Sequence, residues 1–170
     1  MVESARSSQQ ASGTFELISK SPEATEQFGE RLGRALAAGD VIALVGELGS
    51  GKTTLVRGLA KGLGVDSQRV KSPTFILLRE YAGPVPLIHM DGYRVAAAPI
   101  AVWDDLDWVF SPQKVTVIEW GDLVRDCLPE DFLELHLDHK SANQRLIRAV
   151  AHGPRSQQVA EAWRQSAGDS

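Results

Sequence analysis

The glycine-rich segment Gly46 to Thr53, with the sequence GELGSGKT, lies between an unbroken apolar run and a segment of helical periodicity. In this order of strand, loop and helix, backbone N–H groups and the positive end of the helix cradle phosphate groups. Lys52 adds a positive charge, and Thr53 offers a hydroxyl to a magnesium ion that bridges the phosphates. The alternative is a chance match in a surface loop, but the flanking elements argue against it. The segment therefore predicts an α/β fold that binds a nucleoside triphosphate.

The composition fits one compact domain. The chain has 170 residues, of which 43% are hydrophobic and 24% charged, and this length leaves little room for a second core. Its formal net charge is −4, so we expect no DNA partner, and any role with RNA to go through another protein. The single cysteine, Cys127, cannot form an internal disulfide, which favours a reducing compartment. No run of about 18 apolar residues occurs in the sequence, which predicts a cytoplasmic protein without membrane contact.

The periodicity of apolar residues predicts alternating strands and helices. Strands are expected at 15–18, 41–45, 75–78, 85–90 and 115–118, with a hairpin at 133–137 and 145–151 at the sheet edge. One helix follows Ser21 as its N-cap and ends before Gly39, and a second ends at Gly64. We expect a single-domain P-loop NTPase, a three-layer α/β/α sandwich with a mostly parallel central sheet and an antiparallel C-terminal hairpin. The domain is predicted at 14–152, after a disordered tail at 1–13 and before a tail or short helix at 153–170.

Two carboxylates follow apolar strands. Asp91 comes after the run from Leu87 to Met90, and Glu119 comes after Val117 and Ile118. Ligands of parallel α/β sheets bind beyond the carboxyl ends of the strands, so both carboxylates are candidates for holding magnesium or for positioning an attacking water molecule. These residues alone do not assign the two roles. The alternative for each is a solvent-facing acid at the end of a strand.

The segment Ser72-Pro73-Thr74 follows the second predicted helix. Nucleotide switches carry a hydroxyl that senses the γ-phosphate at a comparable place, and proline gives the neighbouring hydroxyls a defined direction. Such a pair of residues is also a common way to begin a loop. Near Asp91, His89 and Arg94 are expected to line the site, with His89 as a satisfied histidine at the strand end and Arg94 facing phosphate or a partner's carboxylate.

Four segments in order resemble a known family. They are GELGSGKTT at 46–54, KSPTF at 71–75, HMDGYR at 89–94 and IEW at 118–120. Their letters, order and spacing are similar to those of the bacterial tRNA threonylcarbamoyladenosine biosynthesis ATPase family, TsaE. The first motif is shared by many P-loop proteins, whereas the other three together are specific. The resemblance covers about Phe15 to Val150.

The resemblance implies an ATPase that uses ATP and Mg²⁺ and acts with two partner proteins, TsaB-like and TsaD-like. ATP hydrolysis would permit repeated turnover of the partner complex, which makes threonylcarbamoyladenosine at position 37 of tRNAs reading codons that begin with A. Magnesium would be held by Thr53 and Glu119, with Asp91 as the Walker B-like carboxylate, Ser72 and Thr74 in a switch-like loop, and Trp120 supporting the site. The implied nucleotide-binding residues are Glu47, Leu48, Gly49, Ser50, Gly51, Lys52, Thr53 and Thr54, with Ser21, Glu23 and Arg145 near the adenine.

The sequence departs from the family pattern at two places. Ser50 stands where the family usually has alanine, a change that adds one small hydroxyl to the loop. After Arg94 the family tends to continue with a Leu-Pro-Glu-Glu-Leu-like helix, whereas this chain continues with VAAAP and then Trp103 and Trp108. These tryptophans are expected to be anchors for the core or for a partner. The geometry of the segment after Arg94 is therefore not given by the resemblance.

Two other functions compete with this interpretation. A small P-loop kinase would need a cationic lid over the transferred phosphate, but the sequence has no Lys or Arg between Val95 and Gln113. A nucleotide-gated interaction module would bind ATP without significant hydrolysis. Retention of both Asp91 and Glu119 favours hydrolysis, and we expect an ATPase that is weak alone and stimulated by its partners.

Overall fold

The structure is a computed structural model that describes residues 13–73, 76–98 and 106–168. Thr74, Trp103 and nearly all of the predicted N-terminal tail lie outside these residues. The strands are β1 (Thr14–Ser19), β2 (Val41–Val45), β3 (Leu78–Tyr81), β4 (Leu87–Asp91), β5 (Val115–Glu119), β6 (Leu133–His139) and β7 (Arg145–Ala151). The helices are α1 (Pro22–Ala35), α2 (Lys52–Gly62), α3 (Gly92–Ala96), α4 (Leu106–Val109) and α5 (Pro154–Gly168), with 3-10 helices η1 (Ser67–Arg69) and η3 (Gly121–Cys127).

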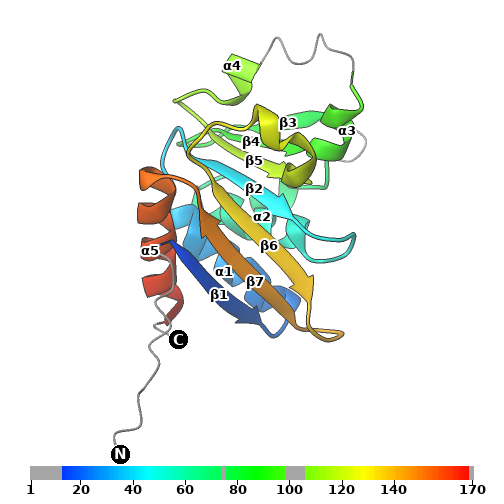
Figure 1. Ribbon diagram of the computed structural model, residues 1–170, viewed down its shortest axis with the longest axis vertical. Coiled ribbons are helices and arrows are strands. Elements are labelled where there is room, and N and C mark those ends of the chain that lie inside the picture. The colour runs from blue at the N-terminus through cyan, green and yellow to red at the C-terminus, as the bar shows by residue number, and fades with distance from the viewer. Residues whose placement is uncertain (1–12, 74–75, 99–105, 169–170) are drawn as a thin grey trace, which may run out of the picture.

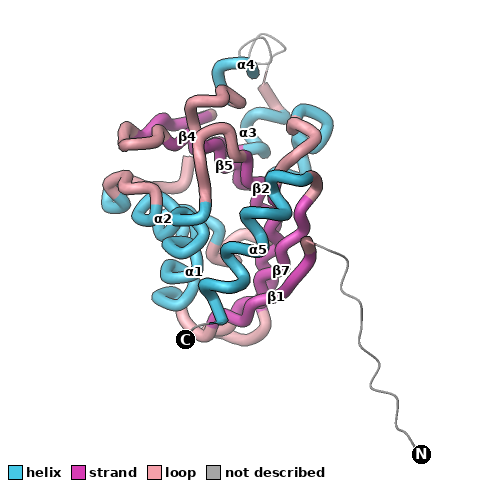
Figure 2. The backbone as a smooth tube through the Cα atoms, turned by 90° about the vertical axis from the view of Figure 1, so that its left-hand side faces the viewer, coloured by secondary structure: helices cyan, strands magenta, loops and turns pink. Residues whose placement is uncertain are grey.

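The seven strands of the described residues form one twisted sheet in the order β1-β7-β6-β2-β5-β4-β3 (Figure 1). The four central strands, β6, β2, β5 and β4, are parallel, while β3 and β7 run antiparallel to their neighbours. Helices α1, α2 and α5 cover one face of the sheet, as the turned view in Figure 2 shows, and the shorter α3 and η3 contact the other. The predicted three-layer P-loop NTPase fold is confirmed, with a parallel centre and antiparallel strands at both margins.

Two details of the predicted sheet were wrong. The C-terminal hairpin does not form the sheet edge, because β1 pairs with β7 from Thr14↔Val150 to Ser19↔Arg145 and is itself the edge strand. The strand expected at 75–78 begins only at Leu78, since its extent is set by antiparallel pairing with β4, from Leu78↔Met90 to Tyr81↔Leu87. Both errors concern pairing between strands, which the apolar pattern of a single segment does not encode.

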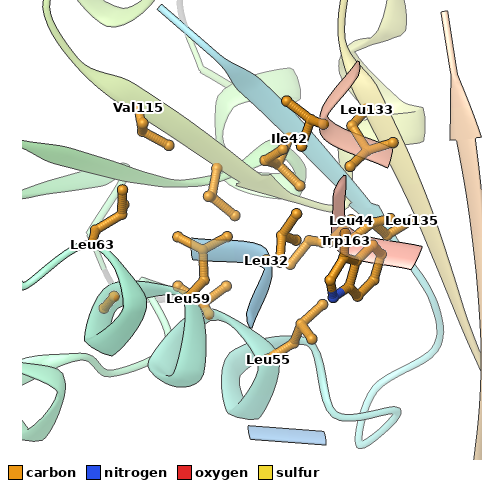
Figure 3. Close-up of a cluster of buried hydrophobic side chains, with 14 of the residues drawn as sticks. Leu32, Ile42, Leu44, Leu55, Leu59, Leu63, Val115, Leu133, Leu135 and Trp163 are labelled. Atoms are coloured by element: carbon orange, nitrogen blue, oxygen red, sulfur yellow. The ribbon is translucent and has the colours of Figure 1, made fainter. Parts of the chain in front are cut away.

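The main hydrophobic core lies between the sheet and the helices α1, α2 and α5. Figure 3 shows leucines from both helices and strands converging there, among them Leu32, Leu44 and Leu59. Trp163 of α5 is fully buried in this core, and its indole N–H donates to the carbonyl oxygen of Phe28 at 2.9 Å. Helix α5 is therefore packed against α1 and the sheet. No helix in the described part of the chain is long and apolar enough to cross a membrane.

Helices α1 and α2 pack with their backbones in close contact. A Cβ atom added at Gly58 would lie 1.9 Å from the carbonyl oxygen of Glu26, and one added at Gly62 would lie 2.2 Å from that of Glu30. On α1, a Cβ at Gly29 or Gly33 would lie 2.2 Å from a carbonyl oxygen of α2. Glycines four residues apart share one helix face, so each helix presents a flat strip to the other. We call these four residues the glycine interface. Because no side chain separates the two helices there, α1 packs directly against α2, the helix that follows the phosphate loop.

Candidate nucleotide-binding site

The loop between β2 and α2 adopts a conformation that requires glycine. Gly49 and Gly51 have positive φ angles of 78° and 101°, which side chains disfavour. A Cβ on Gly46 would lie 2.6 Å from both the carbonyl oxygen of Leu137 and the Oγ of Ser50. The Ser50 hydroxyl fits beside Gly46, fully buried, without a hydrogen-bond partner in the described residues. Because the first N–H groups of a helix have no acceptor within it, the start of α2 directs its N–H donors at this loop.

Lys52, the first residue of α2, turns its side chain back into the loop. Its Nζ donates to the carbonyl oxygens of Gly46 at 2.6 Å and Glu47 at 2.9 Å, and lies 4.1 Å from the centre of the Trp120 ring. Burial lowers the pKa of this ammonium, and the charges of Glu119, Asp122 and Asp91 partly offset that shift. The charges of three carboxylates thus act on this buried cation.

Trp120 reaches the lysine through an unusual backbone conformation. Among the described residues, it is the only residue other than glycine with a positive φ angle, 57°. This left-handed conformation costs about 1 kcal/mol or more for a bulky side chain. Trp120 also precedes η3, directly after the end of β5. The strained backbone of Trp120 therefore lies where the chain leaves β5, and it places the aromatic ring against Lys52.

Glu119 joins β5 to the start of α2. Its Oε1 accepts a hydrogen bond from the hydroxyl of Thr53 at 2.8 Å and lies 2.9 Å from Nε2 of His89. The Glu119 side chain is nearly buried, and His89 is completely buried. We call Glu119, Thr53 and His89 the Glu119 network. It brings one predicted metal carboxylate into direct contact with the predicted metal hydroxyl.

Asp91 has a different set of partners. It lies beside Glu119 in the parallel register of β4 and β5, and its Oδ1 accepts the backbone N–H of Tyr93 at 3.0 Å and of Arg94 at 3.5 Å. These bonds make Asp91 the N-cap of the short helix α3. The two predicted carboxylates are therefore adjacent, but only Glu119 bonds to the loop helix.

Arg145 connects the β6–β7 turn to the phosphate loop. Its Nε donates to the carbonyl oxygen of Ser50 at 3.2 Å, and a terminal nitrogen lies 3.4 Å from that of Gly49. The other terminal nitrogen donates to carbonyl oxygens of the turn itself, including that of Gln144 at 3.0 Å. One guanidinium thus joins two loops that are distant in the sequence.

A cavity of about 220 Å³ opens beside this junction. It is lined by Pro22, Thr25, Gly49, Gly51, Thr54, Ala142, Asn143 and Arg145. Ser21 and Glu23, predicted near an adenine, flank the lining residue Pro22 at the start of α1, where Ser21 caps the helix by accepting the N–H of Ala24. Leu48, at the tip of the loop, is 88% exposed and points away from the core. The cavity lies between the first turns of α1 and α2, which the glycine interface holds together.

The structure describes only part of the predicted switch segment. Thr74 lies outside the described residues, whereas Ser72 and Pro73 lie within them. The carbonyl oxygen of Pro73 accepts the backbone N–H of Ile76 at 2.9 Å. Strand β3, which follows Ile76 by two residues, pairs along its length with β4, the strand that carries His89 and Asp91.

Sequence reasoning missed three features of the site. The bond between His89 and Glu119 was not predicted. The available signal was the spacing of two residues between His89 and Asp91, which places both side chains on one face of the sheet. The cavity residues Thr25 and Asn143 were not singled out, because they come from segments that meet only in the folded chain. The contact of Arg145 with loop carbonyls was likewise not predicted; the sequence placed this residue only near the base.

Comparison with known proteins assigns the fold and the motifs to one family. The family model described as Threonylcarbamoyl adenosine biosynthesis protein TsaE matches residues 19–147. The tRNA threonylcarbamoyladenosine biosynthesis protein TsaE of Streptomyces coelicolor is 46% identical over 117 residues, 66% of this chain and 77% of that protein. The protein of the same name from Bacillus subtilis is 36% identical over 141 residues, 82% of this chain and 87% of that protein. The crystal structure of Bacillus subtilis YdiB matches with a TM-score of 0.74 at 31% identity, covering 92% of this chain and 99% of that one.

Proposed function

This chain belongs to the TsaE family, and from that premise we propose that it binds and hydrolyses ATP in the biosynthesis of threonylcarbamoyladenosine in tRNA. Its P-loop NTPase fold makes it a nucleotide-binding protein. The observation that carries the proposed hydrolysis is the contact of the Thr53 hydroxyl with Glu119, beside the Lys52 ammonium. This set contains a phosphate-binding cation and two oxygen ligands for a metal ion, which are recurring parts of sites for phosphoryl transfer.

The residues of the loop are chemically suited to a triphosphate. The N–H groups at the start of α2 add donors and the positive end of a helix. Lys52, now bonded to two loop carbonyls, would exchange these for phosphate oxygens. These features support binding of the β- and γ-phosphates at Glu47 to Thr54.

We propose Glu119 and Thr53 as the protein ligands of Mg²⁺, because their oxygens already lie together and Mg²⁺ prefers oxygen ligands. When bound, this ion would neutralise charge that develops on the phosphates. Asp91 keeps its bonds to the N–H groups of α3, and we propose that it acts through its charge on Lys52 and through the placement of Tyr93 and Arg94. This assigns the metal to Glu119 in preference to Asp91.

The cavity beside Arg145 supports a site for the adenine. Its lining combines the start of α1 with the β6–β7 turn, where Ser21, Glu23 and Arg145 are expected to lie near the base. Arg145 holds the loop carbonyls of Gly49 and Ser50, so we propose that it orients the loop as well as the base. The Asn143 amide supplies both a donor and an acceptor to this cavity.

We further propose that two partner proteins, TsaB-like and TsaD-like, stimulate hydrolysis and that tRNA is reached through their complex. The family role supports such a pathway, and the net charge of −4 argues against direct capture of tRNA by an overall basic field. Ser72 and Thr74 are proposed to form the segment that responds to the γ-phosphate. The chain alone is expected to hydrolyse ATP slowly, because an incomplete site lacks groups that orient water or neutralise charge.

Phosphate release from ATP tests this proposal, measured for the chain alone, with each partner-like protein and with both. We expect hydrolysis to need Mg²⁺ and to rise by about tenfold or more with both partners. Lys52→Ala should weaken ATP binding roughly 100-fold, because bonds of an ammonium to phosphate are charge-assisted. Lys61→Ala is the matched control, since the side chain of this lysine on the same helix pairs with Glu30, at 3.0 Å, away from the phosphate loop. Absence of both stimulation and complex formation would overturn the proposal.

A further inference from the structure

His89 is a buried polar residue in an apolar strand. It lies in β4 between Ile88 and Met90, and its side chain is 0% exposed. One ring nitrogen, Nε2, lies 2.9 Å from Oε1 of Glu119. The other, Nδ1, has no hydrogen-bond partner among the described residues although it is fully buried. A leucine or methionine here would avoid leaving a polar atom without a partner, so folding alone does not account for the histidine.

The partner of Nε2 determines where the ring carries its proton. A carboxylate accepts hydrogen bonds and does not donate them, so Nε2 holds a hydrogen, and in the neutral ring Nδ1 is the acceptor. Oε1 then receives two donors, the Nε2–H of His89 and the hydroxyl of Thr53 at 2.8 Å. Because both bonds converge on one oxygen, the carboxylate is held in one orientation and Oε2 is left for another ligand.

We propose that His89 is a positioning residue for Glu119, which keeps the carboxylate directed at Thr53 and at a magnesium ion. This inference rests on the proposed function of Glu119 as a metal ligand. As a metal ligand, the Thr53 hydroxyl would turn a lone pair toward the ion while its O–H still donates to Glu119, so the carboxylate has two anchors, Thr53 and His89. His89 approaches from β4 and has no role in phosphate binding, so its bond persists. Partners that orient a ligating carboxylate in this way raise metal affinity.

The two amide substitutions of His89 separate this role from packing. The amide nitrogen of His89→Gln lies near the place of Nε2 and can donate to Glu119, whereas that of His89→Asn reaches only the place of Nδ1. The readout is the affinity for a non-hydrolysable ATP analogue with and without Mg²⁺. We expect His89→Asn to lose about tenfold to 100-fold of the Mg²⁺-dependent part of binding, and His89→Gln to stay within about threefold of wild type. Affinity without Mg²⁺ and melting temperature should change little in either variant.

The outcome that would overturn the proposal is equal behaviour of the Asn and Gln variants, whether both match wild type or both weaken. His89→Leu provides a second check, with an expected loss like that of His89→Asn at an unchanged or higher melting temperature. Nitrogen NMR of wild-type His89 should give the Nε2–H tautomer, and the Nδ1–H tautomer would contradict the assigned bond. The binding measurements separate this inference from the proposed function. If the chain did not hydrolyse ATP even with both partners, the proposed ATPase activity would be overturned. The difference in Mg²⁺-dependent affinity between His89→Asn and His89→Gln would still be expected.

Discussion

The two sides of the phosphate loop are held by different physical means. On one side, the glycine interface brings α1 against α2 so closely that a Cβ at Gly58 would lie 1.9 Å from a backbone carbonyl oxygen. On the other side, one oxygen of Glu119 joins the end of β5 to α2 through Thr53 and to β4 through His89. Backbone packing has no alternative arrangement of similar energy, whereas hydrogen bonds can be exchanged for bonds to a ligand.

Because of this difference, we expect the two sides to have different roles. The side of α1 lines the cavity beside Arg145, where we propose that the adenine binds. The side of β5 holds Glu119 and Thr53, which we propose as metal ligands, so we expect the chemistry to depend on this side. Substitutions on the first side are therefore expected to reduce stability and binding together, and those on the second to reduce hydrolysis with the fold intact.

The largest effect is expected from Gly58→Ala. The added Cβ would meet the carbonyl of Glu26, so the two helices must separate. We expect a loss of about 3 kcal/mol of unfolding free energy, and a melting temperature lower by roughly 6–12 °C. Thermal unfolding measures it. Gly168→Ala in α5 is the control, because a Cβ there would have no atom of the described residues within 4 Å, so the melting temperature should not fall. A stable Gly58→Ala with normal nucleotide affinity would refute the role of the glycine interface.

Glu119→Ala is the corresponding change on the opposite side. Mg²⁺-dependent hydrolysis with both partners should fall roughly 100-fold or more, since a metal ligand is lost. Unfolding free energy should change by less than about 1 kcal/mol, because the substitution also removes a buried charge. Phosphate release and thermal unfolding of the same samples give both values. Normal hydrolysis by this variant would transfer the metal site to Asp91.

Arg145→Ala has an intermediate effect, because this residue connects the loop to the sheet without belonging to either side. Loss of its bonds to Gly49 and Ser50 is expected to weaken ATP binding about tenfold, or about 1.4 kcal/mol. Arg145→Lys should not restore it, since a single ammonium cannot reach carbonyls of both loops. Calorimetric titration measures the affinity. Arg148→Ala on the same strand is the control. Arg148 pairs with Glu16 and Asp138, so the ATP affinity of this variant should equal that of the wild type.

The smallest effect concerns α5, which packs behind α1. Asp131 accepts the N–H groups of Arg155 and Ser156 at 2.8 and 3.0 Å and so caps this helix. Burial would raise the pKa of the Asp131 carboxyl, but these hydrogen bonds and the charge of Arg155 hold it below the ordinary value. Its stabilisation is therefore present above the unfolded pKa of 3.8 and is lost as the pH falls through the lower, folded pKa.

Asp131→Ala should accordingly cost about 1 kcal/mol at neutral pH, with ATP affinity unchanged. The difference from wild type should shrink as the pH falls below the unfolded pKa. Denaturant unfolding at several pH values measures it, with the exposed neighbour Glu130→Ala as the control. A difference that persisted at the lowest pH would show that the carboxylate charge is not what stabilises α5.

The sequence predicted the elements best where the signal is local. The start of α1 after Ser21, the end of α2 before Gly64 and the glycine-rich loop were all readable, because caps, turns and apolar periodicity depend on neighbouring residues. The pairing of β1 with β7 and the start of β3 were not, because strand partners come from distant segments. The glycines of α1 and α2 show four-residue spacing in the sequence, but that spacing does not say which helix faces which.

What the sequence determined by itself is the inventory: a phosphate loop, a lysine and a threonine at the start of its helix, and two carboxylates at strand ends. The tertiary structure decided their relations. It joined Glu119 to Thr53 and to the buried His89, turned Asp91 to the cap of α3, and brought Arg145 onto the loop. Backbone geometry and hydrophobic periodicity act over a few residues and can be read from letters. Which oxygen meets which donor depends on strand order, register and close helix packing, and these exist only in the folded chain.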